Sequence, residues 1–161
     1  MVQFSFYFRV NSLLDKSHMV VDFGCGRGAG ADDQLAIRRD LRNFKGKVRR
    51  VIGLDVDPAG INNPNVDEFH ILNEERWPVK SKTVDLVLCD NVVEHLENPE
   101  SFFKESRRCL RDGGYLCCRT PNSLGYVSII SRIIPDKLHG RVINVAQKNR
   151  KLEDVFPAYY R

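Results

Sequence analysis

The stretch Val20–Gly28 reads Val-Val-Asp-Phe-Gly-Cys-Gly-Arg-Gly and decides the fold of this chain. An apolar run leads into three glycines at alternate positions, and an acidic residue, Asp22, stands two places before the first of them. A buried parallel strand that opens into a glycine turn brings bare backbone close to a ligand. The pattern therefore predicts a ligand-binding turn in which Gly24, Gly26 and Gly28 leave room for the ligand.

The composition is that of one globular domain. The chain has 161 residues, of which 42% are hydrophobic and 29% are charged, enough for one core and too few for two ordinary domains. We expect residues 1–161 to form a single domain, with a cofactor-binding core over 18–122 and a partial substrate-binding or capping region over 123–161.

The net charge is mild and local. Lys and Arg number 25 against 21 Asp and Glu, a net charge of +4. Much of the excess lies in one segment, at Arg38, Arg39, Arg42, Lys45, Lys47, Arg49 and Arg50. No RNA-binding signature or interleaved aromatic residues accompany these charges, so we interpret them as a solvated helix face and predict no nucleic-acid partner.

The cysteines and the chain start favour a cytoplasmic protein. Five cysteines show no Cys-x-x-Cys pair and no ligand-like spacing to the four histidines, which indicates reduced thiols. The aromatic N-terminus lacks a basic leader and a cleavage site, and no apolar run approaches the ~18 residues that cross a bilayer. We therefore expect no signal peptide and no membrane span, while the oligomeric state stays open.

Short apolar runs alternate with helical patterns, which is typical of βαβ units and an α/β fold. The predicted strands are Met19–Phe23, Arg50–Asp55, Glu68–Leu72, Val84–Cys89 and Gly114–Arg119. These runs favour a doubly wound, mostly parallel sheet covered by helices on both faces, in three layers.

Three helices are predicted between and after these strands. One follows the glycine turn, with Ile37, Leu41 and Phe44 on a single apolar stripe. A second begins at Asn98-Pro99 and ends at Gly113-Gly114; its predicted inner face is Phe102, Phe103, Ser106, Cys109 and Leu110. A third covers Ser123–Ile134.

Polar residues follow the second and third predicted strands, and ligands bind outside the carboxyl ends of strands in such sheets. Asp55 is placed to accept hydrogen bonds from a ribose diol, whereas Asp57 is interpreted as a cap before Pro58. Asn73 and Glu74 are placed to meet the edge of an adenine ring.

The glycine turn taken alone fits two cofactors. Its pattern Gly24-x-Gly26-x-x-Ala29 also matches the dinucleotide fingerprint, and an acid after the second strand serves NAD as well. Asp22 favours S-adenosylmethionine, because a carboxylate there repels a pyrophosphate but attracts an ammonium and a sulfonium group.

Further motifs follow in order at Val84–Leu96, Arg108–Gly114 and Thr120–Asn122. Together with Val20–Gly28 they make the chain resemble the class I S-adenosylmethionine-dependent methyltransferases, in particular the branch of ubiquinone-type O-methyltransferases and methyltransferases of unassigned substrate. The resemblance implies a Rossmann-like sheet of five strands in the order 3-2-1-4-5. The sixth and seventh strands of the full class I fold are expected to be missing after Arg119.

The resemblance also implies a set of cofactor-binding residues: Asp22, Gly24, Cys25, Gly26, Gly28, Asp55, Val56, Asn73, Glu74, Cys89, Asp90 and Asn91. Asn73 stands where the family has Asp, so it keeps an acceptor without the charge. Asn91 stands where the ubiquinone-type branch has an acid thought to help bind a divalent ion, so no metal is predicted.

Glu94 and His95 allow two interpretations. In the first, His95 is the general base on a substrate hydroxyl and Glu94 orients it. Adjacent helical residues point about 100° apart, so both cannot face one atom. In the second, which we favour, His95 satisfies backbone groups below the pocket and Glu94 bonds locally. His95 remains the best available base.

The resemblance implies methyl transfer from S-adenosylmethionine to a small-molecule acceptor by in-line displacement at the sulfonium, with O-methylation favoured by the branch. The alternatives are a non-catalytic S-adenosylmethionine-binding module and, less favoured, an NAD-dependent oxidoreductase. The acceptor is expected to meet residues 4–14, residues 122–134 and the C-terminal tail.

Overall fold

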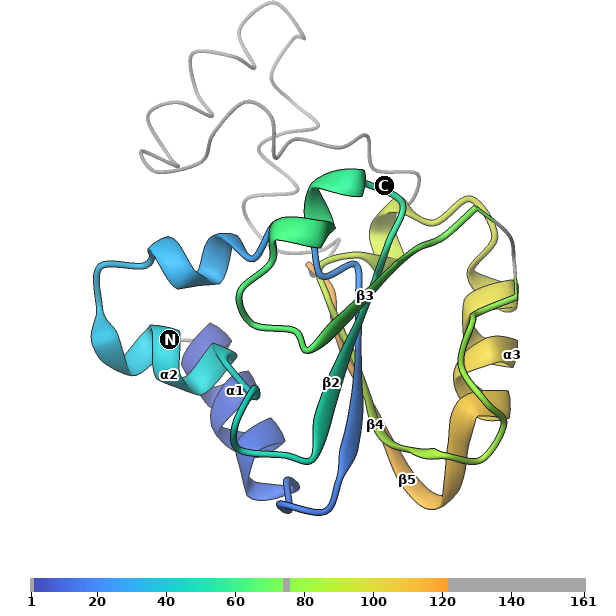
Figure 1. Ribbon diagram of the computed structural model, residues 1–161, viewed down its shortest axis with the longest axis horizontal. Helices are drawn as coiled ribbons and strands as arrows, with labels where there is room; N and C mark the ends of the chain where they lie inside the picture. The colour runs from blue at the N-terminus through green and yellow to red at the C-terminus, as the bar shows by residue number, and fades with distance from the viewer. Residues whose placement is uncertain (1, 74–75, 122–161) are drawn as a thin grey trace, which may run out of the picture.

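The computed structural model describes residues 2–73 and 76–121. Its centre is a sheet in which every pairing is parallel, in the order β3-β2-β1-β4-β5 (Figure 1). The strands are β1 (Met19–Phe23), β2 (Arg50–Asp55), β3 (Glu68–Ile71), β4 (Val84–Asp90) and β5 (Leu110–Arg119). The predicted fold class and strand order are confirmed.

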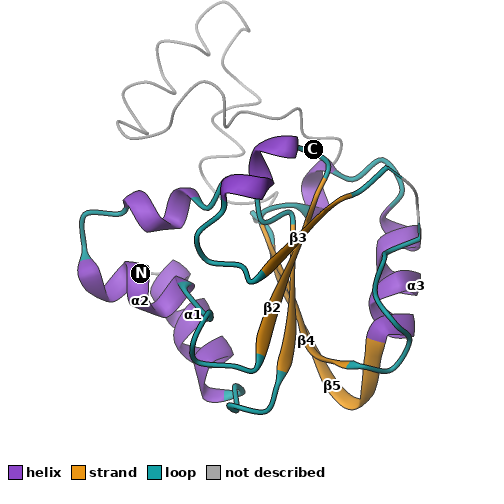
Figure 2. Cartoon of the chain, viewed as in Figure 1, coloured by secondary structure: helices purple, strands orange, loops and turns teal. Residues whose placement is uncertain are grey.

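Helices cover both faces of this sheet, which gives the three predicted layers. Figure 2 shows α1 (Val2–Ser12) and α2 (Ala36–Arg42) on one side of the strands and α3 (Pro99–Cys109) on the other. Three 3-10 turns complete the described elements: η1 (Ala29–Asp32), η2 (Pro58–Asn62) and η3 (Val93–His95). Among residues 2–73 and 76–121, no helix has the length and apolar character needed to cross a membrane.

The central strands are buried on both faces because consecutive side chains point to opposite sides. In β1, Val20 packs with Tyr7 and Val10 of α1, whereas Val21 packs in the cluster that contains Phe102 of α3. Strand β2 alternates in the same way, and β4 does so from Leu86 to Cys89. The near-continuous apolar runs are therefore explained by a sheet with two cores.

The helix on the glycine-turn side differs from its prediction. Helix α2 is only seven residues long and buries none of its residues, and Ile37 is 61% exposed. Phe44 of the predicted stripe is buried, but it lies beyond the helix end. Helix α1, which no sequence pattern predicted, covers that face of the sheet instead, with Tyr7 and Val10 in its core cluster.

Helix α3 begins as predicted and ends earlier than predicted. Asn98 caps it by accepting from the backbone nitrogen of Ser101, but the helix stops at Cys109 and the next residue, Leu110, already pairs with Val84 of β4. Gly113, with φ of 82°, lies inside β5 near a shift in register. It therefore bends the strand and does not end the helix.

Only part of the predicted inner face of α3 is buried. Phe102 packs against both Phe23 and Trp77, with ring centroids 4.8 Å and 5.8 Å away, and Ser106 and Cys109 are also buried. Phe103 is 47% exposed, because two adjacent helical residues cannot face the same surface. The helix predicted over residues 123–134 lies outside the described residues.

Arg108 ties the segment after β3 to α3. Its guanidinium donates to the carboxylate of Glu105 and to the backbone oxygens of Trp77 and Val79. The same carboxylate accepts from the backbone nitrogen of Trp77 at 2.9 Å, and Arg108 holds the pKa of Glu105 below its usual value. The Arg108 side chain thus donates hydrogen bonds to several polar groups that would otherwise be buried beside the aromatic cluster without a partner.

Replacing Arg108 with Met is expected to lower the free energy of unfolding by about 3 kcal/mol, because it leaves the buried Glu105 carboxylate unpaired. The matched control is Arg107→Met on the exposed side of the same helix, which should change stability by less than about 0.5 kcal/mol. Urea denaturation measures both. Equal losses would contradict this role of Arg108.

Candidate cofactor-binding site

The glycine turn after β1 has left-handed backbone at each of its three glycines, with φ of 72° at Gly24, 51° at Gly26 and 78° at Gly28. A Cβ atom at Gly24 would collide with the side chain of Val92, and one at Gly28 with Asn63. No atom of the described residues lies within 4 Å of a Cβ built at Gly26. Only the middle glycine therefore leaves room for a ligand, and the other two leave room for the protein's own side chains.

Two side chains from other segments hold this turn. Asp55, at the end of β2, accepts from the backbone nitrogen of Gly26 at 2.7 Å. Asn63, which is buried, donates from its amide to the backbone oxygens of Cys25 at 2.9 Å and Gly26 at 3.1 Å. Asn63 was missed at the sequence level; its one local signal is the turn dipeptide that it forms with Pro64.

Asp55 keeps acceptor capacity for a ligand. Its second oxygen accepts from the backbone nitrogen of Asp57 at 2.8 Å, and each carboxylate oxygen has a further lone pair. Asp57 itself caps η2 by accepting from Ala59 at 2.9 Å, as the sequence predicted. The half-buried Asp55 is thus rigidly placed beside Gly26, with an acceptor available for hydroxyl groups.

Three carboxylates gather at one edge of the sheet, because β2, β1 and β4 are neighbours and carry Asp55, Asp22 and Asp90 at or near their carboxyl ends. We call Asp22, residues 24–28, Asp55 and Asp90 the strand-end site. Burial raises the pKa of Asp22 to about 7; Asp90 and Asp55 add to this, and Arg42 opposes it. A cationic group would relieve this repulsion, so the site fits an ammonium-bearing ligand.

Asp90 is the one of these carboxylates that the protein neutralises itself. Arg119 donates to both of its oxygens, at 2.6 Å and 2.8 Å, and the hydroxyl of Tyr7 donates to it at 2.7 Å. Tyr7 and Arg119 were missed. A charged residue at the end of a predicted strand is a signal that could have found Arg119, whereas nothing local marks Tyr7.

The remaining predicted cofactor residues lie in different environments. The thiol of Cys89 is fully buried in the core, so only the backbone of this residue faces the strand ends. Cys25 is half-buried, and burial raises the pKa of its thiol. Val56 is 68% exposed, and Asn73 and Asn91 are also exposed. Glu74 lies outside the described residues.

Glu94 and His95 follow β4 in η3. The Glu94 side chain is buried and accepts from the hydroxyl of Thr120 at 3.1 Å, which joins η3 to the end of β5. His95 is half-buried, and its backbone nitrogen donates to Val92 at 2.8 Å. The Glu94 contact joins residues 26 apart in the chain, so both interpretations of this pair stay predictions.

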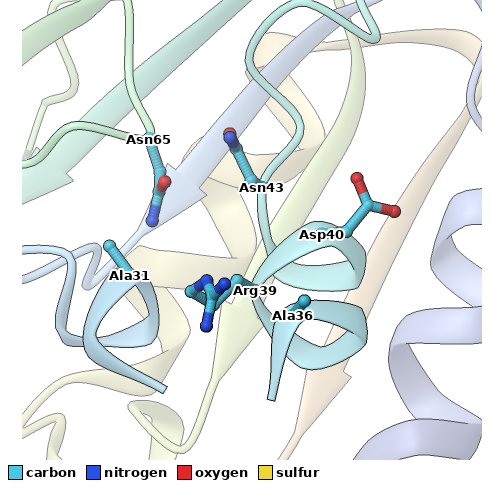
Figure 3. Close-up of a pocket in the computed structure, with 6 residues that line it drawn as sticks. All are labelled: Ala31, Ala36, Arg39, Asp40, Asn43 and Asn65. Atoms are coloured by element: carbon cyan, nitrogen blue, oxygen red, sulfur yellow. The ribbon is translucent and has the colours of Figure 1, made fainter. Parts of the chain in front are cut away.

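A separate cavity of about 310 Å³ lies between η1 and α2. Figure 3 shows its lining residues, which are Ala31, Ala36, Arg39, Asp40, Asn43 and Asn65. None of them belongs to the strand-end site. Within the described ranges, no three His, Cys, Asp or Glu side chains are grouped to hold a metal ion; the assignment without a metal stays a prediction.

Comparison with known proteins identifies the family. Residues 6–154 match the family model of a methyltransferase domain. The chain is 35% identical over 140 residues to a probable S-adenosylmethionine-dependent methyltransferase of Mycolicibacterium smegmatis, covering 83% of this chain and 49% of that protein. It is 29% identical over 105 residues to a ubiquinone biosynthesis O-methyltransferase of Cupriavidus pinatubonensis, covering 64% of this chain and 41% of that protein.

Among solved structures, an S-adenosylmethionine-dependent methyltransferase of Thermotoga maritima superposes with a TM-score of 0.60 at 22% identity, covering 88% of this chain and 60% of that one. At this identity the likeness shows the fold alone. The chain spans about half the length of the curated relatives it matches.

The dinucleotide interpretation of the glycine turn is set aside by these matches. The family model covers well over half of the sequence, the sheet has the same architecture as the solved relatives, and the charge at the strand ends suits a cationic ligand. The chain therefore belongs to the class I S-adenosylmethionine-dependent methyltransferases, and its cofactor is S-adenosylmethionine.

Proposed function

We propose that this protein binds S-adenosylmethionine at the strand-end site and transfers its methyl group to a small-molecule acceptor, with oxygen as the favoured acceptor atom. The observation that carries the proposal is the open space at Gly26 between two acidic strand ends, Asp22 and Asp55. Two relatives named as O-methyltransferases, one for ubiquinone biosynthesis and one for malonyl-[acyl-carrier protein], support the choice of oxygen.

Each part of the cofactor has a candidate partner in this site. Asp22 meets the ammonium group, Gly24–Gly28 carry the methionine part, and Asp55 with Val56 meets the ribose hydroxyls. Asn73 and Glu74 are assigned to the adenine ring. The backbone of residues 89–91 is assigned to the neighbourhood of the transferable methyl group. The chain thus binds the donor through charge at one end and hydroxyl acceptors in the middle.

The cofactor supplies an already activated methyl group on a sulfonium. The protein therefore has to hold the acceptor in line and exclude water, and needs no fixed triad. A hydroxyl acceptor also has to lose a proton, and we assign His95 as its base because it lies just beyond β4 and histidine is the side chain that most often serves as a general base. We also propose that the chain forms a single domain and that the protein is cytoplasmic. Its five free cysteines are consistent with that location.

S-adenosylhomocysteine is expected to bind the unmodified protein in isothermal titration, and Gly26→Ala is expected to weaken it at least tenfold, because the new methyl group occupies ligand space. The matched control is Gly46→Ala, in the turn before β2, since Gly46 also has positive φ, 81°, and open space around a built Cβ. Both variants place alanine at a positive φ, which strains the backbone of an L-residue. Equal effects on affinity, or tighter binding of NADH than of S-adenosylhomocysteine, would contradict the assignment.

Asp22→Asn is expected to raise the stability of the fold and to lower the affinity for the cofactor product, S-adenosylhomocysteine. Because the folded pKa of Asp22 is raised to about 7, its contribution to stability is present near pH 4 and is lost as pH rises to about 7. Above that pH the variant should have a free energy of unfolding that is higher by about 4 kcal/mol, which is the pKa shift of Asp22 converted to energy, while its affinity for S-adenosylhomocysteine falls. Thermal melts and titrations at pH 8 measure the two effects.

The pH profile of binding tests the same residue. Affinity of the unmodified protein should rise roughly tenfold per pH unit up to about pH 7 and then level, because ionised Asp22 is the form that attracts the ammonium group. Asp22→Asn should flatten the profile. A flat profile in the unmodified protein would remove Asp22 from the ammonium site.

His95→Gln tests the base. With a hydroxyl acceptor found by screening for S-adenosylhomocysteine release, kcat should fall about 100-fold while the affinity for S-adenosylhomocysteine stays within twofold. An unchanged kcat would leave His95 with a structural role. Tight cofactor binding without release on any acceptor would favour the non-catalytic binding module.

A further inference from the structure

Arg119 lies at the carboxyl end of β5 and forms a salt bridge with Asp90 at the end of β4. Its Nε donates to one carboxylate oxygen at 2.6 Å and its Nη2 to the other at 2.8 Å. The two side chains are only 19% and 11% exposed. A two-point pair of this kind fixes both distance and orientation, and partial burial makes its charges matter more than those of a surface pair.

The pair also holds helix α1 on its face of the sheet. The Tyr7 hydroxyl donates to the Asp90 oxygen that Arg119 Nη2 contacts, and the Phe6 ring centroid lies 5.7 Å from the Arg119 guanidinium carbon. Asn11 ties the same helix to the end of α2 through the backbone oxygen of Leu41, at 2.8 Å. Asp90 is therefore the point where α1, β4 and β5 meet beside the cofactor site.

The charge of Asp90 acts on Asp22, whose pKa it raises. The charged and titratable groups around it are Tyr7 on α1, Cys25 in the glycine turn, Arg42 on α2, Asp55 on β2 and Asp90 on β4. Burial and nearby carboxylates keep Tyr7 and Cys25 protonated, because they raise the pKa of both. Of the neighbouring charges, Asp90 raises the pKa of Asp22 most.

Arg119 is the only partner of Asp90 in the described part of the chain that brings a positive charge within hydrogen-bonding distance. Without it, the Asp90 charge would act on Asp22 undiminished. Asp22 would then hold its proton to higher pH and lose its attraction for an ammonium group.

We propose that Arg119 is a positioning residue for the methyl donor: it offsets part of the charge of Asp90 and holds that carboxylate against Tyr7, so that Asp22 can ionise and meet the donor's ammonium group. The inference rests on the proposed binding of S-adenosylmethionine at the strand-end site. It assigns Asp90 to the support of the donor.

The experiment is a double-mutant cycle read as the pH midpoint of S-adenosylhomocysteine affinity. Arg119→Met should raise the midpoint by about one pH unit and weaken binding about fivefold at pH 7. Asp90→Asn keeps the shape of the side chain and should lower the midpoint. The double variant, Arg119→Met with Asp90→Asn, should return affinity at pH 7 to within about threefold of the unmodified protein.

The sheet supplies a matched control at its opposite end. Arg111, also on β5, pairs with Asp85, also on β4, with Arg111 Nε 2.5 Å from the carboxylate. Arg111→Met should lower the melting temperature and leave the pH midpoint of binding unchanged. This control separates a general loss of contacts between β4 and β5 from a specific effect on the pH dependence of cofactor binding.

Three outcomes would overturn the inference. A midpoint that stays fixed in Arg119→Met would show that the pair is only structural. A double variant that binds no better than Arg119→Met would show that Asp90 is not the group through which Arg119 acts. If Arg119→Met does not fold, an unmoved midpoint in Asp90→Asn decides against the inference. Absence of binding in the unmodified protein would instead overturn the proposed function itself.

Discussion

Repulsion between like charges at one edge of the sheet is the constraint on which the strand-end site depends. Asp22, Asp55 and Asp90 are brought together because three neighbouring parallel strands carry acids near the same ends. The protein treats each differently. Asp55 accepts from the backbone nitrogens of Gly26 and Asp57, Asp90 accepts from Arg119 and Tyr7, and Asp22 is left with a raised pKa. Among the described residues, no cation is hydrogen-bonded to Asp22, so this carboxylate is the one available to a cationic ligand.

Helix α1 joins the packing of the sheet to the chemistry at its edge. Because α2 is short and buries none of its residues, one face of the strands is covered by α1. Tyr7 contributes to that core and also reaches Asp90 with its hydroxyl. Stability of this layer and the geometry of the strand ends therefore depend on the same side chain.

In the glycine turn, two glycines make room for side chains of the protein and one leaves space for a ligand. Gly24 and Gly28 admit Val92 and Asn63, residues that follow β4 and η2, so the turn is held from both sides. Gly26 alone keeps open space, and its backbone nitrogen and oxygen are already bound to Asp55 and Asn63. A ligand would thus meet a turn that needs little rearrangement, which reduces the entropic cost of binding.

Local patterns in the sequence were sufficient for the sheet, its strand order through the family motifs, the caps at Asp57 and Asn98, and the acids at the ends of β1 and β2. These features depend on alternation, turn chemistry and spacing, which neighbouring residues specify. The tertiary structure alone decided that α1 covers the sheet, that Ile37 and Phe103 face outward, and that Tyr7, Asn63 and Arg119 serve the site. Those contacts join residues far apart in the chain, and packing between distant elements leaves no periodic trace in the sequence.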